Sequence, residues 1–157
     1  MYDGTAYHGF QRQKNSGTIQ ECLENAIKAI TGEKVTVTGC GRTDAGVHAA
    51  GYVANFYSDT KIPPARLPIA INAYLNDDIR IKSAEYVSSD FHARFSAQRK
   101  TYTYKIINAP VLNVFLRKYA WFYPVKLNYE KMQEGAKYFV GKHDFAAFMA
   151  AGSPVKS

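Results

Sequence analysis

The order of helix and strand patterns along this 157-residue chain predicts an α+β fold. Two amphipathic helical segments in the first hundred residues are each followed by β-branched or alternating segments. Residues 2–5 read Tyr-Asp-Gly-Thr, a turn sequence of the kind that follows a strand. With a strand at this start, the first part reads β-α-β-β-α-β. That order predicts a ferredoxin-like unit, in which helices cover one face of a mainly antiparallel sheet.

The clearest helix is predicted over residues 18–30. Thr18 and Glu21 have the spacing of an N-terminal capping box, and Gly32 supplies a C-terminal stop. The apolar residues of the segment fall on one helical face: Ile19, Leu23, Ala26, Ile27 and Ile30.

The remaining elements follow from the same patterns. Strands are predicted over residues 35–38, 52–57, 79–87 and 101–107, and further helices over residues 67–75 and 129–140. The last helix is expected to end at Gly141 and to turn five residues inward: Tyr129, Met132, Ala136, Phe139 and Val140.

Charge and composition favour an anionic partner. The chain has 20 Lys+Arg against 13 Asp+Glu, a net charge of +7, which is typical of nucleic-acid binding but also of a merely basic soluble protein. Cys22 and Cys40 fit neither a disulfide framework nor a metal-ligand spacing, and the four histidines have no ligand spacing. No apolar run approaches a membrane span of about 20 residues, and no signal segment is recognisable. A reduced, cytoplasmic protein without a metal is expected.

The loop over residues 39–48 holds the most specific chemistry. It reads Gly-Cys-Gly-Arg-Thr-Asp-Ala-Gly-Val-His and follows a predicted strand. A carboxylate on such a loop, Asp44, suits a nucleophile or base, and Arg42 is expected to keep it ionised. The competing interpretation of Asp44 is a turn former or helix N-cap. A dinucleotide-binding loop is excluded, because Asp44 occupies the position of its third glycine and no long helix follows.

A second group of residues suits RNA. Tyr102 and Tyr104 alternate along a predicted strand and follow Arg99 and Lys100, an arrangement that favours base stacking with phosphate contacts. The alternative is that both rings fill the core.

The segment over residues 91–97 combines aromatic and basic side chains. His92 and Arg94 are candidates for phosphate binding, with Phe91 and Phe95 as anchors, although a buried loop with satisfied polar groups fits equally well. No serine or cysteine nucleophile motif and no Walker-type loop is present.

Taken in order, these segments resemble the TruA family of tRNA pseudouridine synthases. The similar segments cover almost the whole chain: residues 2–13, 18–24, 41–49, 72–79, 91–97, 102–104 and 139–145. Two positions depart from the family pattern, since Phe10 stands where tryptophan is usual and Asn76 where proline is usual.

The resemblance implies isomerisation of uridine to pseudouridine in the tRNA anticodon stem-loop, without cofactor or metal. Asp44 is the implied catalytic residue, acting on the sugar C1′, on the base C6 or on a sugar proton. Arg42 is expected to hold the flipped nucleotide, and Tyr102 to stack on the uracil. Further RNA contacts are expected from four side chains: His48, Arg94, Arg99 and Lys100.

The resemblance also implies two ferredoxin-like halves around a cleft and a homodimer at full length. Residues 1–108 are then the catalytic half, and residues 109–157 begin a second, similar half. Both ends are expected to be cut, because only Met1 precedes the first turn and the tail stops in polar residues. Two alternatives are a non-catalytic RNA-binding module of the same shape, which does not need Asp44, and a folded fragment that neither binds tightly nor reacts.

Overall fold

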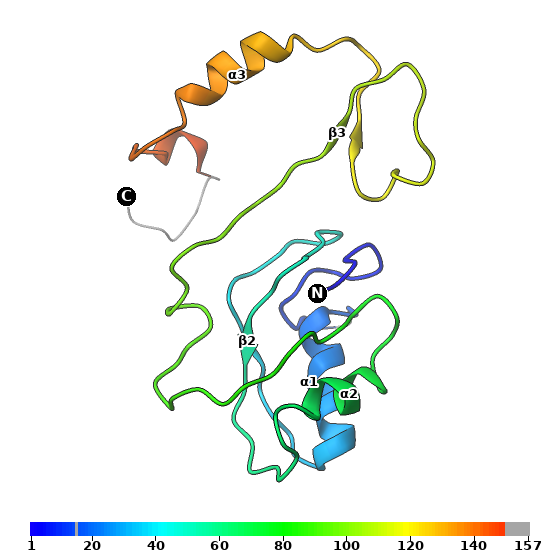
Figure 1. Cartoon of the computed structure of the whole chain (residues 1–157), viewed down its shortest axis with the longest axis vertical. Helices are drawn as coiled ribbons and strands as arrows, with labels where there is room; N and C mark the ends of the chain where they lie inside the picture. The colour runs from blue at the N-terminus through cyan, green and yellow to red at the C-terminus, as the bar shows by residue number, and fades with distance from the viewer. Residues whose placement is uncertain (15, 150–157) are drawn as a thin grey trace. The chain divides into compact units, whose positions relative to one another are not determined.

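The computed structural model describes residues 1–14 and 16–149, and confirms the α+β class. The chain divides into two compact units, Met1–Thr103 and Tyr104–Ser157 (Figure 1). The first unit contains α1 (Ile19–Thr31), β1 (Thr38–Gly39), β2 (Ala54–Asn55) and α2 (Leu67–Asn72). The second contains β3 (Ile106–Ile107), β4 (Trp121–Phe122), α3 (Tyr129–Lys137) and the 3-10 turn η1 (Ala146–Phe148).

Helix α1 forms where the sequence predicts it. The Thr18 hydroxyl accepts the Glu21 N–H at 3.4 Å, and Gly32 closes the helix in the left-handed conformation at φ 76°. The Glu21 carboxylate, expected to complete the capping box, instead pairs with Arg12 at 3.2 Å. The predicted apolar face is buried, apart from the half-buried Ile30.

Among residues 1–14 and 16–149, the buried core lies in the first unit. Helices α1 and α2 pack side by side (Figure 1). Ile19, Ile27 and Ile79 are almost fully buried, and each such side chain stabilises the fold by about 1.5–3 kcal/mol. The core residues come from the N-terminal segment, both helices and the intervening extended segments: Tyr2, Tyr7, Phe10, Ile19, Leu23, Ala26, Ile27, Val35, Val37, Leu67, Ile71, Leu75 and Ile79.

The strands of the first unit are shorter than predicted. β1 and β2 pair in antiparallel fashion over two residues each, in place of the predicted 35–38 and 52–57. Residues before β1 are extended and bury Val35 and Val37, but the Val37 N–H donates to Glu24 Oε1 at 3.1 Å. The Glu24 side chain of α1 thus accepts the N–H that would otherwise bond to a neighbouring strand.

The prediction of a strand over residues 79–87 is wrong beyond its first residue. Ile79 forms an isolated antiparallel bridge with Tyr2. Two residues later, the Asn72 side chain bonds both the N–H of Ile81, at 2.8 Å, and its carbonyl, at 3.0 Å. Helix α2 ends at Asn72, before the predicted residue 75, and the Asn72 side chain satisfies backbone groups of Ile81 that a ladder would have paired.

The second unit also has fewer residues in strands than expected. Only Ile106–Ile107 of the predicted strand 101–107 becomes β3, which pairs in parallel with β4. Tyr102 and Tyr104 are 68% and 91% exposed, so the interpretation of these rings as core residues is wrong.

Helix α3 begins as predicted but stops early. The Asn128 side chain caps it by accepting the Lys131 N–H at 2.8 Å, and the helix ends at Lys137, well before Gly141. The predicted inward face is wrong, because nothing in the described part of this unit buries any residue of α3. In residues 1–14 and 16–149, no helix is long and apolar enough to span a bilayer.

Candidate active site

The candidate catalytic aspartate lies on an exposed turn that follows β1. Val47 N–H donates to the Asp44 carbonyl at 3.2 Å, and Gly46 adopts a left-handed φ of 78°. The backbone of Asp44 therefore forms a turn, as the competing interpretation expected. Its carboxylate does not act as a cap, since no described N–H donates to it, and it points to solvent-accessible space. A turn and a reactive carboxylate are compatible here.

Arg42 does not pair with Asp44. Both side chains are exposed, and the described ion pairs involve other residues. Among the described ion pairs none joins the two side chains, and the expectation that Arg42 keeps the Asp44 carboxylate ionised stays a prediction. An exposed pair gains little because water screens both charges and the side chains lose freedom. Arg42 is instead available to an anionic ligand.

The N-terminal segment holds the backbone of this loop. Phe10 N–H donates to the Thr43 carbonyl at 3.1 Å, directly before Asp44. Gly46 N–H donates to the Tyr7 carbonyl at 3.2 Å, two residues after it. The aspartate thus lies between two backbone hydrogen bonds to the same segment.

Gly9 permits this close approach. Its φ is +83°, and a Cβ at this position would overlap the carbonyl oxygen of Thr43. Only glycine combines that backbone conformation with the absence of a side chain.

Tyr2 and Tyr52 tether the loop further. Tyr2 exchanges backbone hydrogen bonds of 2.9 and 3.0 Å with Ala49, and its hydroxyl lies 2.9 Å from Thr43 Oγ1. The Tyr52 hydroxyl donates to the Gly41 carbonyl. The residues flanking Arg42 on both sides are therefore each bonded to a tyrosine.

The environment of Tyr52 places Tyr102 near the loop. The Tyr52 ring stacks on Phe10 with centroids 4.4 Å apart. Burial chiefly raises the pKa of Tyr52, and interactions with charged forms of neighbours, including Tyr102, raise it further. Tyr102 is therefore within electrostatic range of Tyr52.

Lys100 lies beside Gly41, the residue that precedes Arg42 in the loop. A Cβ built on Gly41 would be 3.3 Å from Lys100 Nζ, which puts the ammonium group over the loop backbone next to Arg42. The structure thus brings Lys100 next to the residue that precedes Arg42, although the predicted strand forms only at Ile106–Ile107 and includes neither Lys100 nor Tyr102.

His48 ties the end of the loop to the N-terminal turn. Its Nδ1 lies 3.2 Å from the Gly4 nitrogen and 3.0 Å from Asp3 Oδ1. An Nδ1 without a proton accepts the Gly4 N–H, whereas an Nδ1 that carries one donates to Asp3.

Arg94 and Arg99 are not joined to the loop. The Arg94 guanidinium lies 5.5 Å from the centroid of the Phe95 ring, and His92 Nδ1 accepts the backbone N–H groups of Arg94 and Phe95. Neither arginine forms a hydrogen bond or ion pair with residues 39–48 in the part of the chain that the structure describes.

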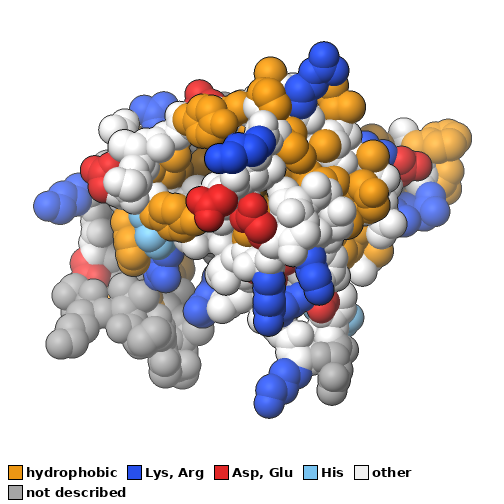
Figure 2. All heavy atoms as spheres, turned by 90° about the horizontal axis from the view of Figure 1, so that it is seen from below, with side chains coloured by type: hydrophobic (Ala, Val, Ile, Leu, Met, Phe, Trp, Pro, Cys, Tyr) orange, Lys and Arg blue, Asp and Glu red, His pale blue; other side chains and the backbone are white. Residues whose placement is uncertain are grey.

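On the face in Figure 2, lysine and arginine are spread among exposed hydrophobic side chains. Within the described residues, no three His, Cys, Asp or Glu side chains come together as a metal site. A shallow hollow over residues 142–149 contains none of the predicted site residues.

The sequence reasoning missed the residues that hold the loop. Tyr7, Gly9 and Tyr52 act through contacts with residues far along the chain. The available signal is the density of glycine and tyrosine in residues 2–10.

Comparison with known proteins defines the class. The tRNA pseudouridine synthase family model matches residues 1–96. The tRNA pseudouridine synthase A of Thermoanaerobacter sp. (strain X514) is 51% identical over 152 residues, covering 97% of this chain and 62% of the relative. That of Acetivibrio thermocellus is 49% identical over 156 residues, covering 99% and 64%. The chain belongs to the tRNA pseudouridine synthase family and spans less than two thirds of these relatives' length.

Proposed function

We propose that this chain isomerises uridine to pseudouridine in tRNA, with Asp44 as the catalytic residue. The observation that carries the proposal is the state of the Asp44 side chain. The carboxylate is exposed and forms no hydrogen bond or ion pair among the described residues, while the backbone on either side of it is held by Phe10 and Tyr7. A reactive group needs this combination of a fixed position and an unused functional group.

The reaction exchanges one bond for another within the same nucleotide. The C1′–N1 bond breaks, the detached uracil turns, and a C1′–C5 bond forms. The C5 proton is lost and N1 gains one, so no oxidant, reductant or second substrate is needed. Asp44 attacks C1′ or C6, or removes a sugar proton, and proximity favours recombination of the held base with the sugar.

The surrounding residues supply the binding half of the proposal. The target uridine must leave its stack to reach an exposed loop, and Arg42 is proposed to hold the flipped nucleotide. Tyr102, 68% exposed, is proposed to stack on the uracil, a contact of about 1–3 kcal/mol. Lys100 is proposed to bind an adjacent phosphate from its position over Gly41.

Three other side chains are proposed as more distant contacts with the tRNA anticodon stem-loop: His48, Arg94 and Arg99. They rest on sequence and charge, because the net charge of +7 favours a polyanion. A homodimer of the longer protein is proposed on the family resemblance alone.

We also propose that residues 1–108 form a ferredoxin-like catalytic half and that residues 109–157 begin a second one. The pairing around Tyr2 supports the first part. Tyr2 bridges Ile79 on one side and Ala49 on the other, both antiparallel, and the segment from Ala49 leads into β2, which pairs with β1. When the four extended segments are counted along the chain, the fourth lies beside the first, the first beside the third, and the third beside the second. This spatial order is that of a split β-α-β unit repeated twice.

The test compares Asp44→Asn with Asp59→Asn in this chain. Asp59 is also exposed, so both variants remove one negative charge from the surface. The measurement is tritium release from 5-tritiated uridine in tRNA, together with tRNA binding at low salt. Asp44→Asn is expected to lower the rate by at least about 10²–10⁴-fold with tRNA binding retained, while Asp59→Asn keeps the rate.

Three outcomes would overturn the assignment. Undiminished tritium release by Asp44→Asn rejects Asp44 as the catalytic residue. Binding without release by the unaltered chain favours the non-catalytic RNA-binding module. Neither binding nor release shows that this chain is a folded fragment without the activity.

A further inference from the structure

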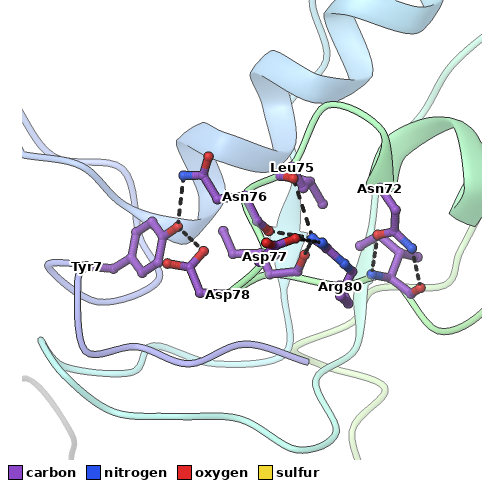
Figure 3. A network of polar contacts seen from close by, with 9 residues as sticks. Tyr7, Asn72, Leu75, Asn76, Asp77, Asp78 and Arg80 are labelled. Atoms are coloured by element: carbon purple, nitrogen blue, oxygen red, sulfur yellow. Dashed lines mark hydrogen bonds and ion pairs between the residues drawn. The ribbon is translucent and has the colours of Figure 1, made fainter.

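Asp78 and Tyr7 form a contact between two segments that are 71 residues apart. The Tyr7 hydroxyl donates to Asp78 Oδ1 at 2.5 Å (Figure 3). Asn76 Nδ2 lies 3.4 Å from the same hydroxyl, in a position where the family usually has proline. The Tyr7 ring is buried, with 7% of its surface exposed, so this polar group is directed at a specific acceptor rather than at water.

Asp78 also binds the turn before Tyr7. Its carbonyl accepts the Asp3 N–H at 2.8 Å, and the Tyr7 N–H donates to the Gly4 carbonyl at 3.0 Å. The N-terminal turn over residues 3–7 is thus held at both ends, once by the backbone and once by the side chain of the same aspartate.

The segment that presents Asp78 is itself braced. Arg80 Nη1 donates to the carbonyls of Asn76, at 2.5 Å, and Ile79, at 2.7 Å, and Arg80 pairs with Asp77 (Figure 3). The Arg80 backbone bonds that of Met1 as well. Asp78 is therefore held on a turn with little freedom to follow a moving partner.

From the other end, Tyr7 reaches the candidate active loop. Its carbonyl accepts the Gly46 N–H at 3.2 Å, two residues beyond Asp44. A continuous chain of contacts thus runs from the braced turn over residues 76–80, through Asp78 and Tyr7, to the loop that carries Asp44.

We propose that Tyr7 and Asp78 are positioning residues that hold the Asp44 loop in its reactive place through the Gly46 N–H. Neither touches the substrate, and the inference rests on the proposed function for its catalytic consequence. Burial first, and then the hydrogen bond to Asp78, raise the pKa of Tyr7 to about 12, so the phenol remains a donor throughout the physiological range.

The first measurement does not depend on activity. Amide hydrogen exchange at Gly46 is compared with exchange in α1 for the unaltered chain, Tyr7→Phe and the control Tyr74→Phe, whose ring is 62% exposed. Tyr7→Phe is expected to speed Gly46 exchange about tenfold relative to α1, since a hydrogen bond to a charged group is lost. Tyr74→Phe should leave both rates as they are.

Asp78 offers a conservative rescue. Asp78→Asn keeps an acceptor oxygen for the Tyr7 hydroxyl, whereas Asp78→Ala removes it. The inference expects Gly46 exchange to rise more in Asp78→Ala than in Asp78→Asn. Equal acceleration of Gly46 and α1 amides in Tyr7→Phe would mean loss of general stability and would overturn the inference.

The second measurement is tritium release from 5-tritiated uridine in tRNA. Tyr7→Phe is expected to lower kcat about tenfold and to change KM by less than about twofold. The reason is that the substitution displaces Asp44 and leaves the residues that contact RNA in place. If kcat is unchanged while Gly46 exchange is faster, the inference that Tyr7 positions Asp44 for catalysis is overturned. If the unaltered chain releases no tritium, the proposed function fails, and the exchange data alone decide whether Tyr7 and Asp78 hold the loop.

Discussion

Replacing Gly9 by alanine tests how tightly the N-terminal segment packs on the candidate active loop. Two effects act at this position. The left-handed φ of +83° is unfavourable for alanine by about 1–2 kcal/mol. The new Cβ also overlaps the Thr43 carbonyl, and overpacking of this kind costs about 1–3 kcal/mol. The expected loss of unfolding free energy is therefore about 2–5 kcal/mol.

Gly32→Ala is the matched control. Gly32 has a similar φ of +76°, but a Cβ there would meet no atom within 4 Å. The Gly32→Ala variant therefore has the backbone strain without the overlap. Both variants share the same small gain in stability from a less flexible unfolded chain. The difference between the two losses, about 1–3 kcal/mol, isolates the contact of Gly9 with Thr43.

The assay is urea unfolding followed by far-ultraviolet circular dichroism, with tritium release measured in parallel. A slope of about 1–3 kcal/mol/M converts the expected difference into a lower midpoint for Gly9→Ala by about 1 M. Gly9→Ala should also reduce turnover more than Gly32→Ala, because the Thr43 carbonyl must move. Equal midpoints and equal turnover in the two variants would refute the reasoning.

Three further predictions concern the support of the first unit. Thr18→Ala should lower the unfolding free energy by about 1 kcal/mol in urea melts, through loss of the α1 cap, whereas a change at the exposed Thr36 should have little effect. Glu24→Ala should lower it by about 1–3 kcal/mol because the Val37 N–H loses its acceptor, and Glu24→Gln should lose less; equal losses would contradict this account. The Tyr7 phenol ionises near 10 when unfolded and near 12 when folded, so its contribution is complete below pH 10 and lost as pH rises to 12. Alkaline urea melts of Tyr7→Phe should show a smaller loss than the unaltered chain, and identical losses would count against this linkage.

Local sequence pattern was sufficient for the helix α1. Its cap, its apolar face and its glycine stop all lie within 15 residues, so the information is local. The strands were overestimated because alternation does not identify a pairing partner. Residues 35–37 are extended, yet Glu24 takes the Val37 N–H, and Asn72 takes the backbone of Ile81.

Local pattern also limits what can be said of the predicted site. Asp44 and Arg42 were predicted from their glycine-rich loop, and in the structure both side chains are exposed and no described ion pair joins them. Lys100 reaches Gly41 of the loop without the strand that was expected to carry it. The failure of α3 to bury its apolar face has a similar cause, since amphipathic spacing predicts a face and not its partner.

The sequence by itself determined the class of the fold, the helix α1, the position of the aspartate on a glycine-rich loop and membership of the tRNA pseudouridine synthase family. Each of these follows from short sequence motifs or from sequence similarity to known proteins, without coordinates. Only the tertiary structure decided what holds Asp44 in place. The Tyr7 hydroxyl donates to Asp78, 71 residues away, and the Tyr7 carbonyl accepts the Gly46 N–H. Folding brings these groups within hydrogen-bond distance, and their spacing along the chain does not predict the contact.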